Sequence, residues 1–452
     1  MTGVQTCALP ICFQNCFKIP ELRRKILFTI GILIVYRLGG QITVPGIRDT
    51  VLQEYFAGAG NTLFGLYDMF VGGAFTRATV FALGIMPYIS ASIILQLMGA
   101  VLPFFQKLQR EGEEGRNKIN QYTRYGTVFL AGAQSLGVSY FLENIKGPTS
   151  GIEAVIDPGW GFRLLTMLTI TTGTIFIMWL GEQITERGIG NGISLIIFVG
   201  IIAELPFAVK SEWNHYLINR GFTKSLIEEL FLVVLMVAVV AAVVLMTQGQ
   251  RRIPVQYAKR VVGRRVYGGQ TTNIPLRINA AGVIPIIFAQ SIMFLPGTIT
   301  QFFPESDVMQ VLGAYFTTSS SVYWFFYGTM IVFFTYFYTA IVMDPQQLAD
   351  NMKRHGGFIP GVRPGKRTAE YIDGIMTRIT LPGSLALAAV AIFPFFVINQ
   401  FNVTPSYSQF FGGTGLLIIV GVALDTLQQV ESQLMTRHYE GFMKKGRIQG
   451  RR

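Results

Sequence analysis

Cysteine is almost absent from this chain, and histidine is rare. The three cysteines, Cys7, Cys12 and Cys16, lie within the first 16 of 452 residues, so the rest of the chain can form neither a disulfide framework nor a thiolate metal site. The three histidines are too scattered to suggest a metal cluster. The composition therefore argues against a metalloenzyme, and we expect no bound metal or cofactor.

Charge is also scarce. Asp, Glu, Lys and Arg make up 14% of the residues, against roughly 25% in an ordinary globular protein. Hydrophobic residues make up 51%, and this imbalance predicts a membrane protein. The formal net charge is nevertheless +12, which suggests cationic surfaces that meet anionic lipid, nucleic acid or an acidic partner.

The first residues do not fit the rest. Residues 1–16 carry no basic residue before their short apolar stretch, so they make a poor secretory signal. They look like a foreign leader, with a natural disordered terminus as the alternative. We leave them out of the fold prediction.

Long uncharged stretches recur along the chain, as crossing a hydrocarbon layer of about 30 Å requires. Residues 230–246 are apolar throughout, and further stretches without Asp, Glu, Lys or Arg are 78–106, 125–142, 164–181, 278–304, 322–343 and 379–424. The last is long enough for two spans joined by a loop around 399–408. With the segments near 26–44 and 189–207, the sequence predicts ten transmembrane helices.

Basic residues are concentrated in alternate loops. The segment 248–275 contains six Lys and Arg residues and no acid, and the segment 344–374 and the tail are also basic. The loops at 299–321 and 399–410 have no Lys or Arg. Under the positive-inside rule, ten spans put every basic loop and both termini in the cytoplasm.

One apolar segment is too short to cross a membrane. Residues 61–73 would form a helix only about 20 Å long, and Asp68 lies in its middle. This pattern predicts a half-helix that enters a protein-lined cavity, because backbone cannot end in lipid with unpaired polar groups. A helix lying on the membrane surface is the alternative.

Six long motifs resemble those of the SecY family of protein-translocation channels, in the same order. They are GGAFTRATVFALGIMPYISASIILQ at 72–96, MWLGEQITERGIGNGIS at 178–194, RRIPVQYAKRVVGRRVYGG at 251–269, NAAGVIPIIFAQSI at 279–292, GFIPGVRPGKRTAEYID at 357–373 and FGGTGLLIIVGVALDTLQQVESQLM at 411–435. The resemblance covers about 17–446 and leaves out only the leader.

The resemblance implies an all-α integral membrane protein with ten transmembrane helices in two inverted pseudo-symmetric halves, a clamshell. The halves would be 17–208 and 209–435, followed by a basic cytoplasmic tail at 436–452, and the half-helix at 61–73 would be the plug. The implied function is a passive channel in the cytoplasmic membrane, without a catalytic site. It would translocate unfolded preproteins and release membrane proteins laterally into the lipid.

The resemblance also implies partners. The channel subunit pairs with SecE and SecG, receives signal peptides and preproteins from the ATPase SecA or from a ribosome, and contacts membrane lipids; YidC or SecDF are candidate further partners. The glycine-rich sequence at 188–192 follows no strand and lacks a Gly-Lys-Ser/Thr sequence, so it is a poor phosphate loop. The energy for transport must then come from a partner.

Family motifs place an apolar pore ring at six isoleucines. A narrow ring of methyl groups excludes water yet yields to a passing chain. The ring residues would be Ile85, Ile89, Ile193, Ile197, Ile287 and Ile418. Both pairs spaced i, i+4 lie on one helix face. Without the motif match, such isoleucines indicate ordinary packing or lipid contact.

Further site residues follow from the same match. The plug residues would be Leu63, Phe64, Tyr67, Asp68 and Phe70, and the lateral gate residues would be Pro87, Gln96, Asn279, Pro285 and Gln290. Three prolines, Pro87, Pro285 and Pro394, are expected inside spans. Pro87 and Pro285 would make the gate helices deformable; kinks that only shape helix packing are the alternative. The polar gate residues are expected to bond weakly across the gate.

Basic cytoplasmic loops are the predicted docking site for SecA or the ribosome. The residues are Lys259, Arg260, Arg264, Arg265, Arg363 and Lys366. Positive-inside topology alone also explains basic loops. Arg363 precedes a proline, however, which favours an extended or turn conformation that presents its guanidinium outward.

Two other classes of protein compete with a protein channel. A secondary transporter of a small solute is the main alternative, because such folds also have inverted repeats and broken helices. Coupled transporters usually keep ionisable groups at mid-membrane, whereas these spans are nearly bare, with Arg37 the clearest exception. A membrane-embedded enzyme is the third class, but no paired acids, histidine cluster or nucleophile elbow occurs in the spans.

Overall fold

The computed structural model describes residues 19–57, 63–147, 151–219, 222–257, 260–262, 265–267, 271–279, 281–302, 320–401 and 403–445. The predicted leader at 1–16 lies outside these residues, as do residues 61 and 62 of the predicted half-helix.

Each predicted span overlaps one described helix. These are α2 (Pro20–Gly39), α5 (Met86–Val101), α7 (Glu113–Asn144), α8 (Trp160–Arg187), α9 (Gly192–Asn219), α10 (Phe222–Gln248), α11 (Ile284–Phe302), α13 (Ser321–Val342), α15 (Lys366–Phe401) and α17 (Gly413–Lys445). Within the described residues, six helices are long and apolar enough to cross a membrane, and the bent pair of α5 with α6 (Pro103–Arg110) would be a seventh if the pair forms one span. The chain is a multi-pass membrane protein, and the total of ten spans stays a prediction.

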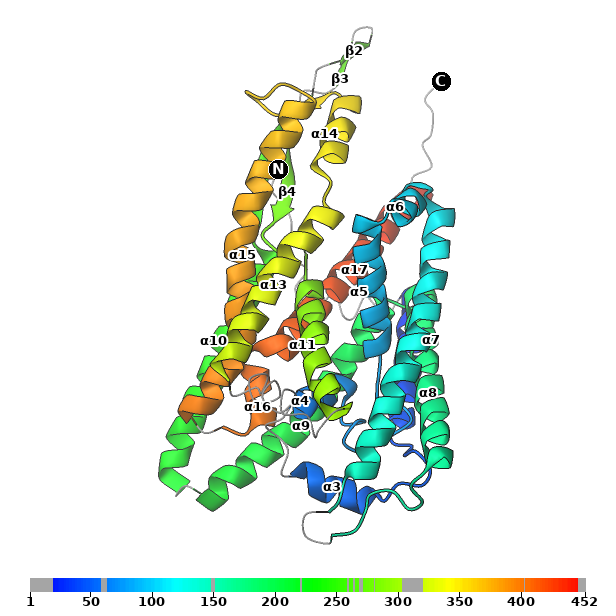
Figure 1. The fold of residues 1–452 in the computed structure, drawn as a ribbon. Helices are drawn as coiled ribbons and strands as arrows, with labels where there is room; N and C mark the ends of the chain where they lie inside the picture. The colour runs from blue at the N-terminus through cyan, green and yellow to red at the C-terminus, as the bar shows by residue number, and fades with distance from the viewer. Residues whose placement is uncertain are drawn as a thin grey trace.

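The helices form two groups that meet along a central seam (Figure 1). One group contains α5, α7 and α8, in which α7 packs against both neighbours. The other contains α10, α13 and α15, in which α13 packs against α15. Helix α11 contacts α13 on one side and α5 on the other, so it joins the groups. The short helix α4 (Leu63–Val71) lies at the centre, and α3 (Asp49–Ala57) lies at one end (Figure 1).

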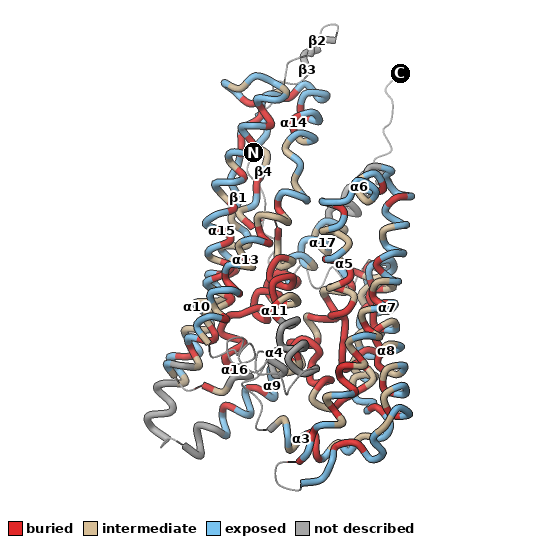
Figure 2. Tube along the Cα trace, viewed as in Figure 1, coloured by how far each residue is buried: buried red, intermediate tan, exposed pale blue. Residues whose placement is uncertain are grey.

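Buried residues are concentrated at this seam, whereas exposed residues cover the outer helix faces (Figure 2). Many exposed side chains are apolar, such as Leu245, which is 74% exposed on α10. Such faces suit lipid better than water. Glycine lets helix α8 approach the turns at 72–85 closely: a Cβ at Gly173 of α8 would lie only 2.1 Å from the carbonyl oxygen of Val80. Small residues at such contacts are typical of membrane bundles.

Two small antiparallel sheets, one of three strands and one of two, occupy the end of the molecule that also carries α14 (Pro345–Arg354) (Figure 1). Strand β1 (Gln250–Tyr257) pairs with β4 (Thr271–Arg277) and with β5 (Gly357–Phe358), and β2 (Arg260–Val262) pairs with β3 (Arg265–Tyr267). These segments were predicted to be loops. The strands form because Ile253 and Val255 alternate with exposed residues and are buried in a second core with Met352 and Ile372.

Two of the prolines expected inside spans lie at helix starts. Pro87 and Pro285 are each the second residue of their helix, α5 and α11. They do not interrupt the interior of these helices: a first helical turn accommodates proline, because its missing N–H would have no intrahelical partner there. Residues 72–85 form turns and bends, with one bridge at Thr79, rather than the start of a span. Pro394 does lie inside α15, as predicted.

Candidate functional site

The candidate site is built around α4, the helix of the predicted plug. Tyr67, Met69, Phe70 and Val71 are buried there, and α4 packs against α9. The helix is therefore enclosed by protein rather than lying on the surface. Leu63 and Phe64, the other apolar plug residues, begin α4, but their side chains lie outside the described set.

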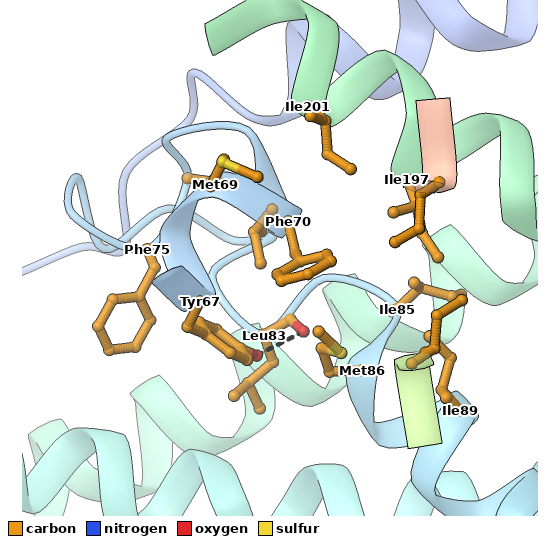
Figure 3. Packing of buried hydrophobic residues seen from close by; sticks show 14 of the residues in the cluster. Tyr67, Met69, Phe70, Phe75, Leu83, Ile85, Met86, Ile89, Ile197 and Ile201 are labelled. Atoms are coloured by element: carbon orange, nitrogen blue, oxygen red, sulfur yellow. Dashed lines mark hydrogen bonds between the residues drawn. The ribbon is translucent and has the colours of Figure 1, made fainter. Parts of the chain in front are cut away.

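Polar groups of α4 bond to the segment that follows it. The Asp68 carboxylate accepts hydrogen bonds from the backbone N–H groups of Phe75 (2.8 Å) and Thr76 (3.0 Å) and from the Thr76 hydroxyl (2.9 Å). The Tyr67 hydroxyl donates to the Leu83 carbonyl oxygen at 2.7 Å (Figure 3). A short helix with an acidic residue in its middle can lie inside an apolar core because these polar groups are hydrogen-bonded.

Three of the predicted ring residues lie near one another beside α4. Figure 3 shows Ile85 and Ile89 of the α5 segment next to Ile197 of α9, with the Phe70 ring turned toward them. Ile287 of α11 and Ile418 of α17 belong to the same central cluster, and Ile418 is only 1% exposed. Ile193 is half-buried and packs against that cluster. Four helices thus contribute isoleucines to one apolar core.

Two further residues of this centre were not predicted from the sequence. Ile201 of α9 is fully buried and lies near Phe70 (Figure 3). It continues the i, i+4 series of Ile193 and Ile197, which was the signal available in the sequence. Gly415 of α17 was missed too, and a Cβ there would lie 2.4 Å from the terminal methyl carbon of Met69. Glycine at this position lets α17 approach α4 closely.

The predicted gate residues are only partly brought together. Helices α5 and α11 are in contact, and the buried Gln290 of α11 lines a cavity beside α4. The other lining residues are Tyr67, Phe70, Met86, Ser90, Gln134 and Ser291. Gln96 instead donates to Ser92 of its own helix at 3.1 Å. Asn279 lies in the turn before α11, and within the described residues its buried Oδ1 has no hydrogen-bond partner.

The predicted docking residues lie at the end that carries the sheet. Arg363 and Lys366 are exposed, and the Thr368 hydroxyl donates to the Arg363 carbonyl oxygen at 2.9 Å. Arg260 is in β2 and Arg265 is in β3, with side chains outside the described set. Lys259 and Arg264 lie outside the described residues.

Comparison with known proteins identifies the family. The family model described as SecY matches residues 79–427. The protein translocase subunit SecY of Escherichia coli is 47% identical over 433 residues, which cover 95% of this chain and 96% of that protein. This chain belongs to the SecY family. The SecY subunit of Aquifex aeolicus is 44% identical over 430 residues, with 95% of this chain and 98% of that protein covered.

Solved structures show the same fold at low sequence identity. A protein-conducting channel matches with a TM-score of 0.61 at 17% identity. A SecY protein whose plug domain stabilises the closed state matches with 0.57 at 17% identity, and Sec61 in the canine ribosome–channel complex from the endoplasmic reticulum matches with 0.57 at 15% identity. Each covers 93% of this chain and 96% of the other. The SecY-family fold therefore extends over nearly the whole chain.

Proposed function

We propose that this chain is the channel subunit of a protein translocase, a pore that passes unfolded preproteins across a membrane and releases membrane segments sideways into lipid. The observation that carries the proposal is that isoleucines from α5, α9, α11 and α17 belong to one buried apolar cluster, which also includes Phe70 of the enclosed helix α4. Such a centre can seal against ions without a fixed substrate site, because an apolar constriction gates by excluding water.

In this proposal α4 is the plug and the six isoleucines are the pore ring. Phe70 and Met69 of α4 pack against the helices that carry the ring, so the closed channel is sealed by apolar contact. A polypeptide that displaces α4 would then meet only methyl groups, which interact with side chains of any sequence at similar, low cost.

The lateral gate would open between α5 and α11. The polar lining of the adjoining cavity, with Gln290 on one side and Ser90 on the other, supplies contacts of only about 0.6–2 kcal/mol each. A signal sequence can exchange with contacts of that strength. The two proposed halves, 17–208 and 209–435, share α9, because their boundary falls within it.

In this proposal, partner proteins supply the energy for transport and complete the channel complex. We assign SecA or the ribosome to the surface with Lys259, Arg260, Arg264, Arg265, Arg363 and Lys366, and SecE and SecG to the membrane-facing surface, with YidC or SecDF as further partners. Sec61 in a ribosome–channel complex supports the ribosome assignment. We place the chain in the cytoplasmic membrane with both termini in the cytoplasm, since the basic loops and tail then share one side.

Reconstitution tests the proposal against a small-solute transporter. Proteoliposomes that contain this chain and SecE should take up a preprotein when SecA and ATP are present, and should not accumulate amino acids or sugars along an ion gradient. Vesicles without the chain are the control. Gradient-driven solute uptake without preprotein uptake would favour the transporter, for which these spans offer few ionisable groups.

Thiol labelling tests the orientation. In a chain whose three native cysteines are replaced by serine, Asn351→Cys on α14 should react with a membrane-impermeant maleimide only from the cytoplasmic side. Asp157→Cys, in the loop between α7 and α8, should react only from outside. Both positions are exposed, so access depends on the side of the membrane. Labelling of both from one side would contradict the proposed topology.

A further inference from the structure

Arg37 is the one charge in the predicted span 26–44, and neither the ring nor the docking surface accounts for it. An arginine within a span is costly and normally has a polar partner. In the structure Arg37 lies in the last turn of α2, where the helix dipole favours a cation, and it is half-buried. A polar group of the protein is therefore expected to bind the Arg37 guanidinium.

The partner is the end of α4. The Arg37 guanidinium donates from Nη1 to the Gly72 carbonyl oxygen at 2.7 Å, and the neighbouring Tyr36 hydroxyl donates to the Val71 carbonyl oxygen at 3.4 Å. Carbonyls at a helix C-terminus have no partner within the helix. Two consecutive residues of α2 therefore bind the two carbonyls at which α4 ends.

Glycine makes this contact possible. Gly72 has a φ of +71°, and a Cβ there would lie 2.8 Å from Arg37 Nη1 and 3.0 Å from the Gly200 Cα. Any side chain at this position would be strained and would push the guanidinium away. The glycine at position 72 thus leaves room for the arginine side chain on one side of the turn, while α9 packs against the other side.

Acidic groups surround the same turn. Gly73 has a φ of +81°, and a Cβ there would lie 2.5 Å from Glu204 Oε1 of α9. Glu204 interacts electrostatically with Asp68, Arg37 and Arg77. The Asp68 carboxylate in turn accepts the bonds that fix the turn after α4. Acidic side chains of α4 and α9 therefore lie around the turn that receives the arginine.

We propose that Arg37 is a positioning residue that clamps the C-terminal end of α4 and holds the plug in the closed channel. This inference rests on the proposed role of α4 as the plug. Apolar contacts seal the pore, whereas the clamp decides where α4 returns after a substrate has passed. A charge-assisted hydrogen bond to one carbonyl is strong enough to favour the closed position of α4. The bond breaks when α4 leaves and forms again when α4 returns.

Accessibility of α4 tests the clamp. In the chain with its three native cysteines replaced, Met69→Cys should react slowly with a maleimide in proteoliposomes that lack substrate, because position 69 is buried. Adding Arg37→Met should raise the reaction rate by about tenfold, the change expected for loss of one charge-assisted hydrogen bond. Arg37→Lys, which keeps the charge and a donor, should restore slow labelling in part.

Arg48→Met is the matched control, because Arg48 also donates to a carbonyl oxygen, that of Glu153 at 3.2 Å, but away from α4. It should leave the labelling rate unchanged. If Arg37→Met does not accumulate, Tyr36→Phe should give a smaller increase. Unchanged labelling in every clamp variant would overturn the inference. Failure of the unmodified chain to transport a preprotein would instead overturn the proposed function, whatever the labelling shows.

Discussion

Arg363→Glu should reduce SecA-driven preprotein uptake by about tenfold or more, while the protein still inserts into the membrane and binds SecE. The guanidinium is exposed, and its backbone is fixed by the bond from the Thr368 hydroxyl and by Pro364. Because the backbone at Arg363 is already ordered, its cation can pair with a carboxylate of a docking partner with little loss of conformational entropy. Charge reversal places like charges together, which costs several kcal/mol, and 1.4 kcal/mol corresponds to a factor of ten.

Lys353→Glu on α14 is the control, because Lys353 is also an exposed cation at the same end of the molecule. Initial rates of uptake into proteoliposomes should fall strongly for Arg363→Glu and little for Lys353→Glu. Equal losses in both variants would mean that only the general positive charge of this surface matters. Normal uptake in Arg363→Glu would leave Arg363 with no function beyond topology.

The transmembrane spans could be predicted because each one requires a long run of uncharged residues. A run of about 20 residues without charge has few structural solutions, so each predicted segment overlaps a helix. The boundaries were less predictable: α7 begins at Glu113, twelve residues before the uncharged stretch, because in water a helix can continue with charged residues. The sheet was missed because the Arg-rich start of β1 resembles an ordinary basic loop.

The site was predictable only through the family motifs. Isoleucine spacing cannot distinguish a pore ring from packing, since both need one apolar face. Partners of polar residues could not be predicted either, because they depend on contacts between distant segments. Arg37 and Gly72 are 35 residues apart, and the backbone carbonyl that joins them leaves no signal in the sequence. The late start of α5 has a similar cause, because the turns at 78–85 are as free of charge as a helix in a span would be.

Ile418→Asn should raise the resting ion leak and let preproteins with defective signal sequences pass. Ile418 is 1% exposed in the central cluster, so an amide there would lack hydrogen-bond partners in the closed state. Leaving such a group unsatisfied costs about 1–3 kcal/mol. The open, hydrated state does not impose that cost, so the closed-to-open equilibrium should shift by roughly five- to hundredfold.

Leu385→Asn provides the control, since Leu385 is 54% exposed on α15 and an amide there would meet lipid in both states. Leak is measured as the decay of a potassium diffusion potential across proteoliposomes without substrate, at matched amounts of folded protein. We expect rapid decay for Ile418→Asn and slow decay for Leu385→Asn, with lower yield in the latter, because a lipid-facing amide destabilises both states alike. If neither variant leaks and both lose stability equally, Ile418 is a packing residue and the ring does not include α17.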